Sequence, residues 1–171
     1  MWVSLGVAVP VTLLLVVLAV VAGPGASGAS SSSLVGGPAP ALSGTELPGG
    51  APTSLASYAG RWVLVDFAAS WCAACRAELP QLEAFALSAP RHDAVVLTVE
   101  EDPTDNANLV RWLAANHARW PVVADPAASP AWGVSGIPSL FLVSPVGIVV
   151  GYYPSVPAPA SLDAVIARGG G

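Results

Sequence analysis

The two cysteines of this 171-residue chain, Cys72 and Cys75, are the residues best suited to chemistry, because both stand in one short motif, SWCAACRAELP. Two thiols at this spacing have three uses: a structural disulfide, part of a metal site, or a redox centre. A complete zinc site is disfavoured, because it needs three or four protein ligands and neither His92 nor His117 shows a paired spacing with the thiols. A structural disulfide that closes so short a loop would stabilise the fold by only about 2 kcal/mol.

The elements expected around the motif favour the redox use. Residues 61–67, RWVLVDF, form a nearly continuous apolar run, typical of a strand buried on both faces. A short turn follows, and apolar residues then recur at helical spacing over 73–87, so a helix is expected to begin at about Cys72. The N–H groups at a helix N-terminus stabilise a thiolate, which makes Cys72 the expected nucleophile. Cys75, one turn further along the same face, is expected to be the more buried thiol and to resolve a mixed disulfide.

The rest of the chain alternates strand and helix patterns, which predicts an α/β fold with a central mixed β-sheet flanked by helices. The expected elements are a hairpin within 40–55, a strand at 94–99, a helix over 104–117 with Thr104 or Asp105 as N-cap, a strand at 121–125, two strands within 139–153 and a helix over 161–168. Residues 126–162 carry no charge, but their prolines and glycines are too frequent for a membrane-spanning helix, so we interpret this stretch as buried sheet.

The chain begins with an apolar segment that bears on its compartment. Residues 2–22 are long enough to span a bilayer as one helix, and a cleaved signal peptide is the alternative, because small residues follow at 22–29. We favour an uncleaved transmembrane anchor within 1–22, followed by a flexible Gly/Ser/Ala linker over 23–37 and a domain over 38–171. Both alternatives export the domain, so it is expected at the extracytoplasmic side of the cell membrane, or secreted if the N-terminus is cleaved.

Charge excludes one class of partner. The net charge is −5, and all six basic residues are arginines. Binding to a nucleic acid needs clustered cations that neutralise phosphates, and no such cluster is present in the sequence. We therefore expect no nucleic-acid partner.

The stretch VLVDFAASWCAACRAELPQLEAF resembles the active-site strand and helix of the thioredoxin superfamily. Its C-x-x-C-x-x-E-x-P continuation is similar to the membrane-tethered TlpA-like and ResA-like branch, and the likeness covers most of residues 38–168. The resemblance implies a thioredoxin-like fold, thiol–disulfide exchange, and neither a cofactor nor a metal. It also implies that the Ile137–Pro138 peptide is cis and faces the cysteines, and that Trp71, Ile137 and Pro138 lie at the substrate-binding surface. From the residues alone, an ordinary trans proline at a strand edge is the alternative.

Two acids accompany the cysteines. Asp66 interrupts the apolar strand six residues before Cys72, where burial should raise its pKa. The resemblance matches Asp66 to an acid that helps to move the proton of the buried cysteine through water. Glu78 shares a helix face with Cys75 and matches an acid peculiar to the TlpA-like and ResA-like branch, with a solvated surface glutamate as the alternative. Which of the two acids accepts the proton stays open.

We therefore expect an extracytoplasmic thiol–disulfide oxidoreductase that exchanges its Cys72–Cys75 pair with protein thiols or disulfides. Cytochrome c maturation, with apocytochrome c as a partner and a membrane redox protein for recycling, is the role that the resemblance favours. Oxidative folding of secreted proteins as a disulfide donor is one alternative, and copper handling through the two soft thiolates is another. The Ala73-Ala74 pair replaces the proline-containing pairs usual in the family. Since residues between the cysteines tune the reduction potential, the direction of electron flow stays open.

Overall fold

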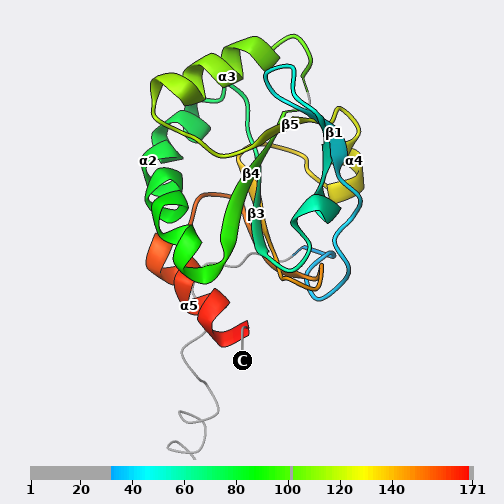
Figure 1. Ribbon diagram of the computed structural model, residues 1–171, viewed down its shortest axis with the longest axis vertical. Helices are drawn as coiled ribbons and strands as arrows, with labels where there is room; N and C mark the ends of the chain where they lie inside the picture. The colour runs from blue at the N-terminus through cyan, green and yellow to red at the C-terminus, as the bar shows by residue number, and fades with distance from the viewer. Residues whose placement is uncertain (1–31, 101, 170–171) are drawn as a thin grey trace, which may run out of the picture.

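The computed structural model describes residues 32–100 and 102–169. They form an α/β fold in which helices cover both faces of a central mixed sheet (Figure 1). Across the described residues the strands are ordered β2-β1-β5-β4-β3-β6-β7. Their bounds are β1 (Ser43–Glu46), β2 (Pro52–Ser54), β3 (Trp62–Phe67), β4 (Ala94–Glu100), β5 (Val122–Ala124), β6 (Ser139–Val143) and β7 (Val149–Tyr153). The helices are α2 (Ala73–Ser88), α3 (Asn106–Ala115), α4 (Ala128–Trp132) and α5 (Pro159–Gly169), with 3-10 turns at Leu55–Tyr58 and Ala89–His92. The predicted architecture, including the N-terminal hairpin of β1 and β2, is confirmed.

Strand β3 lies in the middle of the sheet and leads directly into the cysteine motif. It is buried along its whole length, and it runs parallel to β4 and antiparallel to β6. In this register Asp66 stands beside Thr98 of β4 and Leu140 of β6. Because side chains alternate along a strand, Trp62, Leu64 and Asp66 face one side of the sheet, and Val63, Val65 and Phe67 face the other.

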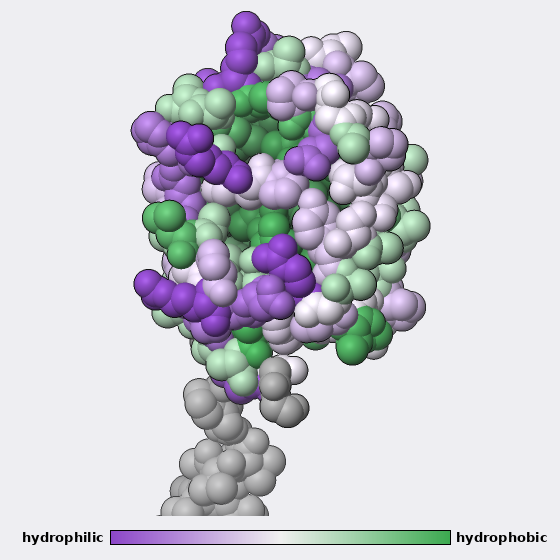
Figure 2. Space-filling model, viewed as in Figure 1, coloured by the Kyte–Doolittle hydropathy of each residue, from purple (hydrophilic) through white to green (hydrophobic). Residues whose placement is uncertain are grey.

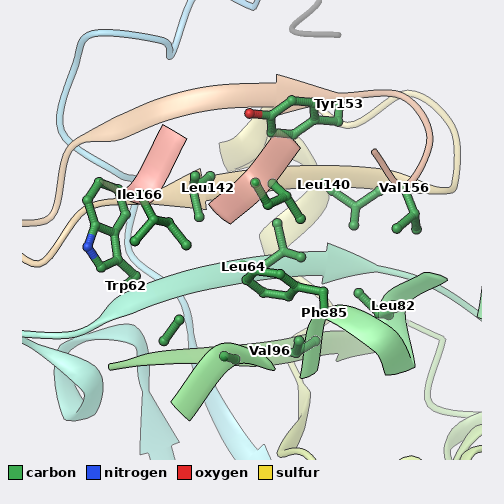
Figure 3. Close-up of a cluster of buried hydrophobic side chains, with 13 residues drawn as sticks. Trp62, Leu64, Leu82, Phe85, Val96, Leu140, Leu142, Tyr153, Val156 and Ile166 are labelled. Atoms are coloured by element: carbon green, nitrogen blue, oxygen red, sulfur yellow. The ribbon is translucent and has the colours of Figure 1, made fainter. Parts of the chain in front are cut away.

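The face that carries α2 and α5 holds a large hydrophobic cluster (Figure 3). Side chains from β3 and β6 meet side chains from both helices there. The labelled members include Leu64, Leu140 and Leu142 from the sheet, Leu82 and Phe85 from α2, and Ile166 from α5. Helix α3 packs next to this core through Leu109 and Leu113, which join Leu79 of α2. The active-site helix is thus held against the sheet by its Leu79, Leu82 and Phe85 face.

The opposite face of the sheet is built on aromatic rings. Ring centroids of Phe67 and Trp132 lie 5.8 Å apart, and Phe141 stands 6.0 Å from Phe67 and 5.1 Å from Trp132. Trp132 ends α4, a one-turn helix that the sequence did not predict because it contains Pro130 and stops at Gly133, whose φ is +63°. Helix α4 lies on the side of the sheet away from α2 (Figure 1).

A surface groove runs between α2, β4 and the segment that joins α3 to β5. Hydrophobic side chains are exposed in hollows on this side of the molecule, framed by hydrophilic ones (Figure 2). The groove is lined by residues that include Ala86, Leu87, Val96, Trp120 and Pro121. Trp120 therefore has one side at the surface and the other toward the core.

The start of the domain differs from the expected boundary. The predicted anchor over 1–22 and most of the predicted linker lie outside the described residues, and no helix in the described part is long and apolar enough to cross a bilayer. Residues 32–37, expected to belong to the linker, instead lie against β7. The Gly36 N–H donates to the Val149 carbonyl at 2.8 Å, and the side chain of Leu34 packs on the aromatic core. One apolar side chain and free backbone N–H groups are enough to dock this glycine-rich stretch on an edge strand.

Candidate active site

The two cysteines form a disulfide at the start of α2. Cys72 is the N-cap residue and Cys75 lies in the first turn, with their Cα atoms 5.3 Å apart. The Cys75 N–H donates to Cys72 Sγ at 3.1 Å, so a free backbone donor of the helix N-terminus is directed at the sulfur of Cys72. This confirms the predicted position of the motif. Both cysteines are buried, with Cys72 5% and Cys75 7% exposed, and they pack with Ala68 and Ile137, so the expected difference in their burial is not seen at the level of whole residues.

An aspartate fixes the turn that carries the motif. Asp105, one of the two N-cap residues predicted for this helix, is the N-cap of α3, but its side chain does not cap its own helix. Its carboxylate instead accepts the Ser70 N–H at 2.7 Å and the Ser70 hydroxyl at 2.6 Å. Asp105 is buried, so both bonds are shielded from water. Next in the chain, Trp71 is 64% exposed and stands at the surface beside the disulfide.

The Ile137–Pro138 peptide is cis, as the resemblance implied, and the Ile137 carbonyl oxygen lies 3.8 Å from Cys72 Sγ. A surface cleft joins this loop to the motif; it is lined by Ala68, Ala69, Trp71, Glu100, Asp102, Ser129 and residues 134–137. The Ser139 hydroxyl donates to the Gly136 carbonyl at 2.8 Å, a bond that links the loop to the start of β6. Trp71 and Ile137, both predicted at the substrate surface, thus line the same cleft.

Asp66 lies beneath the disulfide, where it lines a small cavity together with Cys75, Pro138 and Val156. Burial raises the pKa of Asp66 from 3.8 to about 7; a hydrogen bond from Thr98 opposes this rise, and the nearby charge of Glu78 adds to it. The Thr98 hydroxyl donates to Asp66 Oδ2 at 3.1 Å. An acid with a pKa near neutrality therefore shares an enclosed space with the second cysteine.

Glu78 is half-buried rather than solvated, and its Oε2 accepts the Val156 N–H at 2.7 Å. This bond holds the segment between β7 and α5 against the first turns of α2. The charge of Glu78 also acts on Asp66, from the same helix that carries Cys75. The two predicted acids are thus close enough to interact through their charges, and Asp66 lines a cavity together with Cys75.

Sequence reasoning missed three contributors: Thr98, Trp120 and the Asp105 side chain. Thr98 carries a signal that could have found it, since it is the one hydroxyl in the apolar strand AVVLTVE and lies in register with Asp66. Trp120 and the Ser70–Asp105 contact join segments far apart in the chain, and no local pattern marks them. Among the described residues, no group of three His, Cys, Asp or Glu side chains is arranged to hold a metal ion.

Comparison with known proteins shows which family the chain belongs to. Residues 35–152 match the AhpC/TSA family. The chain belongs to this family. It is 37% identical over 125 residues to the thiol:disulfide interchange protein DsbE of Xylella fastidiosa, an alignment that covers 69% of this chain and 60% of the relative. It is 30% identical over 125 residues to the thiol:disulfide interchange protein HelX of Rhodobacter capsulatus, covering 71% of this chain and 69% of the relative.

A solved structure shows the same fold. The thioredoxin domain of a thiol-disulfide oxidoreductase from Bacteroides vulgatus superposes with a TM-score of 0.69 at 24% identity, over 80% of this chain and 98% of that domain. The thioredoxin-like fold expected from the motif is therefore confirmed. The chain spans only 60% of the length of the DsbE relative from Xylella fastidiosa.

Proposed function

We propose that this AhpC/TSA family member is a thiol–disulfide oxidoreductase that exchanges its Cys72–Cys75 pair with protein substrates. The observation that carries the proposal is the position of Cys72 Sγ, which meets the Cys75 N–H at 3.1 Å and the Ile137 carbonyl at 3.8 Å. One contact stabilises a negative sulfur, and the other places it at the cis-proline loop that borders an open cleft.

In the reductive direction, the Cys72 thiolate attacks one sulfur of a substrate disulfide, and the other substrate sulfur leaves as a thiolate. Cys75 then loses its proton and attacks Cys72 Sγ, which releases the second substrate thiol and forms the Cys72–Cys75 bond. The substrate disulfide gains two electrons, and the protein dithiol loses two. The same steps in reverse donate the disulfide to substrate thiols, so the geometry serves both directions.

Asp66 is the proton acceptor for Cys75 in this proposal. It shares a cavity with Cys75, and its pKa of about 7 lets it take and release a proton near neutral pH. Glu78 has a different task, because its carboxylate is bonded to the Val156 N–H and acts on Asp66 through its charge. Glu78 is therefore the residue that tunes, and Asp66 the residue that moves the proton.

The substrate is proposed to be an exported protein with a cysteine pair, such as apocytochrome c, presented as an extended segment across the cleft between Trp71 and Ile137. The two curated relatives are named as thiol:disulfide interchange proteins, which supports a protein substrate. The apolar segment at the start of the sequence supports a domain tethered outside the cytoplasm. A membrane redox partner would then return the pair to its working state.

Trapping with Cys75→Ser tests the proposal. The reduced full-length variant is mixed with a synthetic peptide that carries a disulfide within a C-x-x-C-H sequence, and the products are analysed by mass spectrometry. We expect one peptide bound through Cys72, because the resolving thiol is missing. The matched Cys72→Ser variant should form at least tenfold less adduct. Equal adduct in both variants, or none in either, would overturn the assignment of Cys72 as nucleophile.

A further inference from the structure

We propose that Trp120 is a positioning residue for proton transfer from Cys75: its indole N–H orients the Thr98 hydroxyl, which in turn holds the Asp66 carboxylate. The inference rests on the proposed exchange reaction and concerns a residue 45 positions after Cys75 in the chain. Three segments meet in this relay: β3 supplies Asp66, β4 supplies Thr98, and the segment before β5 supplies Trp120.

The direction of the relay follows from the chemistry of its members. Trp120 Nε1 lies 2.9 Å from Thr98 Oγ1, and an indole nitrogen only donates. Thr98 Oγ1 must therefore accept this bond, which leaves its own hydrogen for Asp66 Oδ2, 3.1 Å away. A threonine hydroxyl can normally rotate among its neighbours, and the indole removes that freedom. The Asp66 carboxylate therefore always accepts a hydrogen bond from Thr98. This bond favours the ionised form of Asp66 and so opposes the rise in pKa that burial causes.

The three residues of the relay differ in burial, and a backbone hydrogen bond holds the segment that carries Trp120. Asp66 and Thr98 are buried, whereas Trp120 is half-buried and forms part of the surface groove beside α2. The Thr98 N–H also donates to the Pro121 carbonyl at 3.1 Å, so the backbone holds the segment in place independently of the indole. Removing the indole N–H should therefore leave the chain path unchanged.

The titratable groups that face Asp66 in the described structure come from α2: Glu78, through its charge, and Cys75, across the cavity. The cavity is closed from α3 by Trp112 and Leu113, from the β7–α5 segment by Val156 and from the cis-proline loop by Pro138, none of which ionises in the working pH range. A change at Trp120 that alters no charge thus acts on Asp66 through Thr98.

The test replaces Trp120 by Phe in the full-length chain and measures the rate of exchange with a disulfide peptide from pH 5.5 to 9. We expect the inflection that reports Asp66 to move up by about 0.5–1 pH unit, with an unchanged rate at high pH, since one hydrogen bond to the charged form is weakened. The rate at pH 7 should then fall by about two- to fivefold. Thr98→Val should shift the inflection at least as far, and Thr98→Ser, which keeps the hydroxyl, should restore it.

Trp62→Phe is the matched control, because it makes the same chemical change at the far end of β3, within the apolar core. We expect no shift of the inflection in this variant. Direct NMR titration of the Asp66 carboxyl carbon in the oxidised protein gives a second readout that does not depend on activity, and thermal unfolding reports whether each variant folds.

The outcomes separate this inference from the proposed function. If Asp66→Asn removes the inflection but Trp120→Phe and Thr98→Val leave it in place, the relay is refuted and the proton role of Asp66 stands. If Asp66→Asn keeps the inflection, the proton role itself is refuted. Should Trp120→Phe fail to fold, the comparison of Thr98→Val with Thr98→Ser decides the relay on the same measurements.

Discussion

The two faces of strand β3 are built from different chemistry although their residues alternate along the same six positions. On the α2 and α5 side, the apolar row of Trp62 and Leu64 ends in Asp66, just below the disulfide. On the α4 side, the row of Val63 and Val65 ends in Phe67, which joins an aromatic cluster. The face of β3 toward α2 and α5 therefore places a buried acid near the reactive sulfurs, whereas the face toward α4 carries only apolar side chains.

This difference shows how the domain tolerates a site that is costly to bury. A carboxyl whose pKa is raised to about 7 by burial destabilises the ionised protein. The aromatic cluster behind β3 stabilises the same strand from the other side, since each fully buried aromatic ring contributes several kcal/mol. If the faces are independent, changes on the aromatic face should alter stability alone, and changes on the acidic face should alter stability and chemistry together.

The largest effect is expected from the aromatic face. Phe141→Ala removes a ring that contacts Phe67, Trp132 and Tyr152, and should lower the free energy of unfolding by about 3–5 kcal/mol. Urea unfolding of the oxidised protein measures this loss. The pH profile of exchange by the folded fraction should keep its inflection near pH 7, because the variant changes nothing on the Asp66 face. A shifted inflection would show that the two faces are coupled.

The acidic face should give the next largest effect, with the opposite sign. Because the pKa of Asp66 is higher in the folded than in the unfolded chain, folding is most favourable below about pH 4 and becomes less favourable as the pH rises to about 7. A rise from 3.8 to about 7 corresponds to roughly 4 kcal/mol at most. Asp66→Asn should remove this dependence and be about 2–4 kcal/mol more stable than the unmodified protein at pH 8.

Unfolding measured at pH 4 and at pH 8 checks this prediction. The two proteins should differ little at pH 4, where the carboxyl is protonated in the folded chain. The variant should also lose the inflection in its exchange rate. If the Asp66→Asn variant and the unmodified protein were equally stable at pH 8, the ionised Asp66 carboxylate would have to be stabilised in the folded protein by other contacts, and the prediction would be wrong.

Most of the fold was predictable from the sequence because its signals are local. The run RWVLVDF, the cysteine at the start of a helix and the charge-free hairpin over 139–153 each carry a pattern of the right period or a turn signal. The short helix α4 and the docking of residues 32–37 were missed for the same reason: their stability comes from contacts with distant strands, not from their own sequence.

The candidate site divides in the same way. Cys72, Cys75, Asp66 and Glu78 stand within thirteen residues, so the motif and the strand before it were enough to find them. The relay through Thr98 and Trp120 was beyond reach, since it needs the register of β3 with β4 and the path of the segment before β5. The sequence left Thr104 and Asp105 open as the N-cap of α3; the structure has Asp105 there, and its carboxylate bonds Ser70 rather than the N–H groups of its own helix, a contact that no local pattern shows.

The smallest effect is expected at the turn that leaves β3, where the acidic face meets the surface. Ser70→Ala removes the hydroxyl bond to Asp105 and keeps the backbone bond, so the free energy of unfolding should fall by only about 1–2 kcal/mol. The exchange rate should nevertheless fall severalfold, because this turn sets the position of Trp71 and of the Cys72 N-cap.

Ser88→Ala is the matched control for this variant. Its hydroxyl donates to the Phe85 carbonyl at 2.9 Å in the last turn of α2, a full helix length from the cysteines. The control should lose a similar small stability and keep its exchange rate. A turn that merely stabilises the domain would make the two serine variants alike in rate. A slower Ser70→Ala alone would extend the functional region of the acidic face from Asp66 to Asp105.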